Sequence, residues 1–147
     1  MKTNKVTSSL FLGLMLSLGV TACNDEDINS SSADYSDLIP GSSWYVDVTD
    51  SEQETLDFDY KGSGTVCFYD LVDNDWGIMA FGAYELNDNI ITATYDDVSV
   101  VDEDYKSTSW HGFTDGKSKT VKYTIISCDG EKLVLKNGNG DTRTYIQ

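Results

Sequence analysis

The sequence predicts an all-β protein built on a single antiparallel, up-and-down β-barrel of about eight strands. From residue 44 onward, short runs alternate between apolar and polar residues and are rich in Val, Ile, Thr, Tyr and Phe, as half-buried strands are. Gly, Asn and Asp separate these runs, and the lone proline, Pro40, precedes the first of them. Short connections pair each strand with its neighbour, and closing such a meander removes both exposed edges. A two-sheet sandwich is the alternative, but its Greek-key connections require longer crossings.

The clearest strand signal lies in residues 54–60, where side chains of opposite character alternate between the two faces. Leu56, Phe58 and Tyr60 are therefore expected to point inward. The complete set of expected strands is 44–49, 54–60, 64–72, 78–86, 90–96, 120–127, 132–136 and 142–146.

Turn residues connect the later strands. Asp129-Gly130 supplies the positive φ that a tight hairpin requires, and residues 87–89 and 137–140 have a similar composition. Residues 98–118 are irregular, and we expect one ragged strand and a long loop there. No helix is expected after residue 22.

The N-terminus has the layout of a secretory signal peptide over residues 1–22. Lys2 and Lys5 are followed by an apolar run at 10–20, which is too short for a membrane-spanning helix of about 20 residues. Small residues then precede Cys23. This layout predicts an exported protein whose first segment is removed.

Residues 20–23, Val-Thr-Ala-Cys, resemble the lipobox of bacterial lipoproteins. This resemblance implies that the Cys23 thiol carries fatty acyl chains such as palmitate, and that these anchor the mature chain to a membrane. Residues 23–41 would form the lipid anchor and a flexible, acidic and Ser-rich tether, because they contain little to bury. Residues 42–147 would form the barrel domain.

Charge is unevenly distributed along the mature chain. Residues 24–104 contain 21 acidic residues against a single base, Lys61, for a net charge of −20. Residues 105–147 contain seven bases against four acids, for +3, so the two parts sum to −17. Such a surface repels phosphate backbones, and we expect no nucleic-acid partner.

Two cysteines, Cys67 and Cys128, remain after Cys23. They fall on strands that lie far apart in an eight-strand meander, whereas a disulfide needs Cα atoms within about 7 Å. We therefore predict two free thiols.

The sequence contains no recognisable catalytic or metal-binding motif. The single histidine, His111, has no recognisable nucleophile motif around it, and the two thiols and one imidazole lack metal-ligand spacing. We expect no enzyme activity, cofactor or metal. Residues 73–75, 96–97 and 102–104 are acidic but lack the calcium-loop pattern, so calcium binding by these clusters stays open.

Four stretches, at residues 41–44, 62–66, 83–92 and 123–135, resemble the lipocalin-like (calycin-type) domain of Bacteroidetes lipoproteins. This resemblance implies a barrel anchored to the outer membrane, facing either the periplasm or the cell surface. It also implies that Arg143, from the last strand, covers the ring of Trp44 in a cation–π contact that closes the barrel end.

Two functions follow. The first is a non-enzymatic, monomeric carrier that holds a small hydrophobic ligand at the open end of the barrel, with residues 98–118 as a lid. The second is a packed barrel that binds glycan or another envelope protein through its loops and outward aromatic side chains, among them Tyr69 and Trp76. An internal cavity would favour the first function, and a filled interior with exposed aromatic residues would favour the second. The expected inward ligand contacts, each of which could equally be an ordinary core residue, are Trp44, Phe58, Tyr60, Tyr84, Tyr95 and Tyr123.

Overall fold

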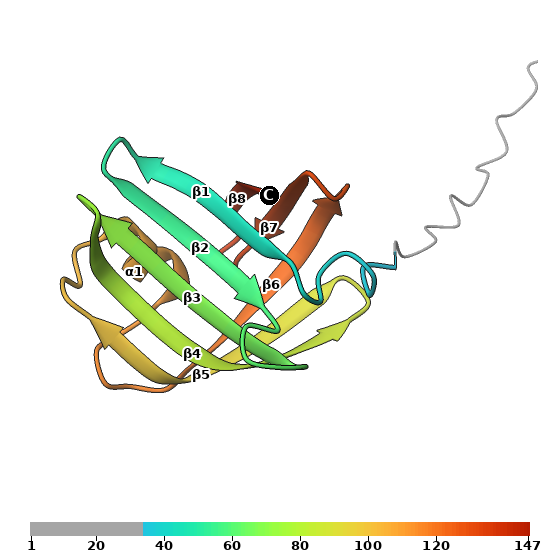
Figure 1. Ribbon diagram of the computed structural model, residues 1–147, viewed down its shortest axis with the longest axis horizontal. Coiled ribbons are helices and arrows are strands. Elements are labelled where there is room, and N and C mark those ends of the chain that lie inside the picture. Colours follow the sequence, from blue (N-terminus) through green and yellow to red (C-terminus); the bar gives the residue numbers. More distant parts are fainter. Residues whose placement is uncertain (1–33) are drawn as a thin grey trace, which may run out of the picture. The chain divides into compact units, whose positions relative to one another are not determined.

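The structure, a computed structural model, describes residues 34–147 (Figure 1). The expected signal peptide, Cys23 and the first part of the tether lie outside the described residues. Eight strands and one short helix make up this part of the chain: β1 (Ser43–Thr49), β2 (Glu52–Phe58), β3 (Thr65–Val72), β4 (Asp75–Asn87), β5 (Ile90–Val100), α1 (Lys106–His111), β6 (Lys119–Cys128), β7 (Lys132–Lys136) and β8 (Thr142–Ile146).

The strands close into an up-and-down barrel. Each strand pairs antiparallel with the next in sequence, and β1 pairs with β8 where Tyr45 lies opposite Ile146. The hairpins use the expected residues, since Asp88, Gly130 and Gly140 have φ values of 53°, 90° and 93°. The predicted fold class and strand order are confirmed.

The β4–β5 hairpin is longer than expected and is bent at one point. The pairing of β4 with β5 shifts register between Phe81 and Gly82. A Cβ at Gly82 would lie 1.9 Å from the carbonyl oxygen of Thr94, so only glycine allows this close approach of the two backbones.

The region expected to be a ragged strand and a long loop contains α1, so the expectation of no helix was wrong. A helix of six residues gives no usable periodicity, and its N-cap residue, Tyr105, makes no side-chain capping bond. Gly112 ends the helix in the left-handed region with φ of 72°. Four of its six residues are buried, so packing stabilises this helix more than propensity does.

Both ends of the barrel are covered. At the end where the β1–β2 turn lies, the backbone N–H of Ser107 in α1 donates to Glu52. At the other end, Tyr35 and Ile39 are buried in the core, and the Trp44 indole N–H donates to Ser42. Residues 35–41, expected in the tether, therefore belong to the folded domain.

The two cysteines within residues 34–147 are free thiols, as predicted. Cys67 lies on β3 and Cys128 on β6. No helix in the described residues is long and apolar enough to cross a membrane.

Candidate functional site

Most of the aromatic residues expected to point inward are buried. Trp44, Tyr95 and Tyr123 are fully enclosed, and Phe58 packs edge-on against Tyr84 with ring centroids 4.9 Å apart. Tyr60 is the exception, because 54% of its surface is exposed. The expectation for Tyr60 was wrong because β2 ends at Phe58 and Asp59 takes a φ of 61°, which breaks the alternation.

Side chains fill the barrel interior. Trp110 of α1 stacks on Tyr123 with ring centroids 5.6 Å apart, and Phe113 lies 5.1 Å from both Phe68 and Tyr95. Hollows of about 710, 610 and 170 Å³ in the described part of the chain are open to the surface; Tyr84 lines the second, Trp110 and His111 line the third, and Phe68 and Tyr95 line none of the three. This packing matches the second of the two expected functions better than the first.

Arg143 has a different aromatic partner from the one implied by the family resemblance. Its guanidinium carbon lies 4.7 Å from the ring centroid of Trp110, not over Trp44. The cause is α1, which the sequence did not predict and which brings Trp110 to Arg143. The same guanidinium forms an ion pair with Glu54.

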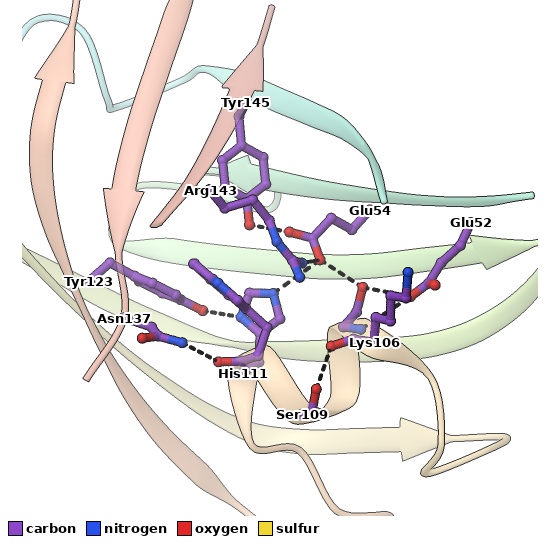
Figure 2. Close-up of polar contacts among 11 residues, drawn as sticks. Glu52, Glu54, Lys106, Ser109, His111, Tyr123, Asn137, Arg143 and Tyr145 are labelled. Atoms are coloured by element: carbon purple, nitrogen blue, oxygen red, sulfur yellow. Dashed lines mark hydrogen bonds and ion pairs between the residues drawn. The ribbon is translucent and has the colours of Figure 1, made fainter. Parts of the chain in front are cut away.

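A buried polar cluster joins α1 to the barrel wall. Figure 2 shows Glu54 of β2 facing His111 of α1 and both Arg143 and Tyr145 of β8. Arg143 and Tyr145 donate hydrogen bonds to the Glu54 carboxylate, and His111 Nε2 lies 3.5 Å from it. Ser107 Oγ donates to the same carboxylate at 2.7 Å. Glu54 therefore connects three elements inside the barrel.

Protonation in the cluster follows from burial and from these neighbours. Burial alone would raise the pKa of Glu54, but His111, Arg143 and Tyr145 hold it below its ordinary value. Burial lowers the pKa of His111, which favours the neutral ring. In that state Nδ1 accepts a hydrogen bond from the Tyr123 hydroxyl at 2.6 Å, and Nε2–H faces Glu54.

Asp70 is a buried carboxylate next to this cluster. It lies opposite Glu54 across β2 and β3, it is buried, and within residues 34–147 neither carboxylate oxygen has a hydrogen-bond partner. Burial, followed by the negative charge of Glu52, raises its pKa to about 7. The cluster thus contains more carboxylates than cations.

The residue types in the cluster occur in acid–base catalysis, but their setting is closed. Glu54 and His111 are both buried, and ring packing around His111 places Phe68 at 4.2 Å and Trp110 at 4.6 Å between centroids. Among the described residues, no group of three or more His, Cys, Asp or Glu side chains is arranged to hold a metal ion. The cluster is suited to hold α1 in place.

The outer surface of β3 and β4 presents a second set of aromatic side chains. Trp76 is 52% exposed and packs edge-on against Tyr69 at 5.4 Å, while Tyr60 lies 6.1 Å from Phe81. We call this surface the outer aromatic face; it consists of Tyr60, Tyr69, Leu71, Trp76, Met79 and Phe81. Strand register makes it continuous, because Tyr69 lies opposite Met79 and Leu71 opposite Trp76.

Cys67 lies beneath this face, opposite Phe81. It is buried, and burial together with the negative charge of Asp57 raises the pKa of its thiol to about 12. Such a thiol is protonated and inert at neutral pH, so it contributes packing to the face and no chemistry.

Comparison with protein-family models, with curated proteins and with solved structures finds no match to this chain. The candidate site is therefore defined by geometry alone, and the outer aromatic face is the region that a partner could reach.

Sequence reasoning identified Tyr69 and Trp76 but missed the interior cluster. A usable signal for Glu54 was present, because the alternation that places Leu56 and Phe58 inward also places Glu54 inward. The same alternation in β3 places Asp70 inward with Phe68.

Proposed function

We propose that this protein is a lipid-anchored envelope protein, monomeric and non-enzymatic, whose filled lipocalin-like barrel is an interaction module. The observation that supports this function is the contrast between a packed interior and an aromatic outer surface, where Tyr60 and Trp76 remain about half exposed. Isolated exposed apolar residues are normal, but a continuous patch is typical of a binding surface.

The proposed location rests on the N-terminal sequence. The signal-peptide layout and the lipobox-like residues 20–23 support anchoring to the outer membrane through Cys23, and the acidic, Ser-rich stretch that follows would hold the domain away from the lipid. Replacing Cys23 with Ser tests this. We expect the variant to lose metabolic labelling by an alkyne-tagged palmitate and to leave the membrane fraction. Full retention of label would disprove lipidation at this residue.

A carrier of a small hydrophobic ligand is less well supported. Both barrel ends are covered, and the expected ligand contacts Tyr95 and Tyr123 pack against Phe113 and Trp110. Native mass spectrometry of the protein, purified gently from its own envelope, distinguishes the two functions. A bare protein mass supports the interaction module, whereas a bound small molecule that is lost on Phe58→Asp would establish a carrier.

The interaction module itself is tested by chemical crosslinking in intact envelopes. The double variant Tyr60→Ala/Trp76→Ala removes the two most exposed rings of the outer aromatic face. Its matched control, Ile126→Ala/Ile146→Ala, removes two exposed apolar side chains from β6 and β8. We expect the first variant to lose crosslinked complexes and the control to retain them. Equal retention by both would refute the function.

A further inference from the structure

We infer that the outer aromatic face binds a positively charged segment of a partner protein, with Lys or Arg side chains seated on its rings. This inference rests on the proposed function and specifies the chemistry of the partner. It is carried by the arrangement of carboxylates around the rings, by a cation already seated there and by the charge of the surrounding surface.

Strand register places acidic residues at the edges of the face. Across β2, β3, β4 and β5, Asp57 lies opposite Cys67, Cys67 opposite Phe81, and Phe81 opposite Asp97. Neighbouring residues in one such row point to the same side of the sheet, so Asp97 lies on the strand next to Phe81, and Asp57 lies two strands away on the other side, beyond Cys67. A cation over the Phe81 ring would therefore have one carboxylate on the neighbouring strand and a second beyond Cys67.

The protein already places one cation on this surface. Lys61 Nζ lies 4.9 Å from the ring centroid of Phe81 and 5.7 Å from that of Tyr60. Both distances are within the range in which an ammonium group is attracted by the face of an aromatic ring, about 6 Å. The rings thus accept an ammonium group, and Lys61 occupies the place that a partner's cation would compete for.

The surrounding charge selects the same kind of partner. Lys61 is the single base among residues 43–100, which span β1 to β5 and contain 13 acids, of which ten are not buried. An anionic partner would be repelled, and a second copy of this chain would bring two acidic faces together. A neutral glycan could stack on the rings but would gain nothing from the carboxylates. A cationic segment uses both features of the face.

The experiment measures binding of a synthetic peptide of alternating Arg and Gly to the full-length protein by fluorescence anisotropy at several salt concentrations. The face variants are Tyr60→Ala/Trp76→Ala and Asp57→Asn/Asp97→Asn. The charge-matched control is Glu103→Gln/Asp104→Asn, which removes two exposed acids from the loop before α1. Thermal unfolding of each variant checks that it is folded.

We expect each face variant to raise Kd about tenfold, as the loss of two exposed cation–ring or charge contacts would do. The control should raise Kd by less than about twofold. Lys61→Ala should tighten binding severalfold, because it removes the competing cation, while Lys117→Ala, an exposed lysine elsewhere, should change it little. If all acidic variants weaken binding equally, the attraction is nonspecific and the inference is wrong.

The envelope crosslinking experiment separates this inference from the proposed function. Complexes that depend on Tyr60 and Trp76 but not on Asp57, Asp97 or salt would keep the interaction module and reject the cationic partner. A neutral β-glucan oligosaccharide that binds the wild type, but not the Tyr60→Ala/Trp76→Ala variant, would also reject the cationic partner and identify a glycan instead. Complexes unaffected by either face variant would reject both.

Discussion

The barrel interior and the outer aromatic face both contain aromatic rings and carboxylates, but those of the interior are buried and those of the outer face are accessible to solvent. Inside, aromatic rings pack against one another, and the Glu54 carboxylate is matched by Arg143, Tyr145 and Ser107. Outside, Trp76 and Tyr60 stay about half exposed, and Asp57 and Asp97 lie on the outward side of β2 and β5, in a stretch of sequence whose single base is Lys61. The interior rings are enclosed by their neighbours, whereas the rings of the outer face remain accessible, and this accessibility is why we place binding on the outer face.

The largest expected difference between the two regions concerns their carboxylates. Glu54→Ala leaves the buried Tyr145 hydroxyl and the partly buried Arg143 guanidinium without their partner and should lower the free energy of unfolding by about 3–5 kcal/mol. Asp57→Ala, on the outward side of the same strand, should change it by less than about 0.5 kcal/mol. Urea denaturation measures both. Similar changes in the free energy of unfolding for the two variants would show that the interior and outer carboxylates contribute equally to stability.

Replacing Asp70 should stabilise the protein, whereas replacing Glu54 should destabilise it. Its pKa rises from 3.8 to about 7 on folding, so the folded state binds this proton more tightly than the unfolded chain. Stability is therefore lost as the pH rises from 3.8 to about 7 and stays low above that. Asp70→Asn should remove this loss and raise the free energy of unfolding by about 1–3 kcal/mol at pH 8, with little change at pH 4. Thermal unfolding across this range tests it; an Asn variant that is less stable at pH 8 would contradict it.

His111 contributes a pH dependence of the opposite sign. Because burial lowers its pKa from 6.5, the stability it contributes is present above pH 6.5 and is lost as the pH falls through the folded-state pKa. In the Asp70→Asn background, stability should therefore fall only on the acid side. His111→Gln in that background should flatten the slope between about pH 6.5 and 4.5, while the loss due to Glu54, whose pKa is also lowered, remains below pH 4.5. An unchanged slope between pH 6.5 and 4.5 would exclude His111 as its origin.

A smaller effect is expected where α1 meets the barrel. Ser107→Ala removes the hydroxyl that donates to Glu54, and this should cost about 1 kcal/mol and increase hydrogen exchange across α1. Ser109→Ala, on the exposed side of the same helix, is the matched control. Mass spectrometry of exchanged peptides covering residues 106–113 measures both. Equal exchange in the two variants would show that the polar cluster does not hold the helix.

Most of the fold could be predicted from the sequence, because strand alternation and turn residues are local signals. Residues 54–58 and 129–130 carried such signals, and the structure confirms them. The helix could not be predicted, because α1 has one turn and a half and no capping bond, and it depends on long-range contacts such as Ser107 with Glu54. The aromatic partner of Arg143 was missed for the same reason. The outer aromatic face was predicted in part, since an outward position follows from alternation, but its continuity follows from register between strands.

At Trp76, a small change in stability should accompany a loss of binding. Trp76→Ala removes a ring whose exposed half contributes little to packing, so the free energy of unfolding should change by less than about 1 kcal/mol. Trp110→Ala removes a ring of the same kind from the interior, where it stacks on Tyr123, and should cost about 3–5 kcal/mol. Denaturation curves for the two variants, measured alongside envelope crosslinking, compare the regions directly. If Trp76→Ala proved as destabilising as Trp110→Ala, the outer ring would be part of the core, and its exposure would no longer indicate a binding surface.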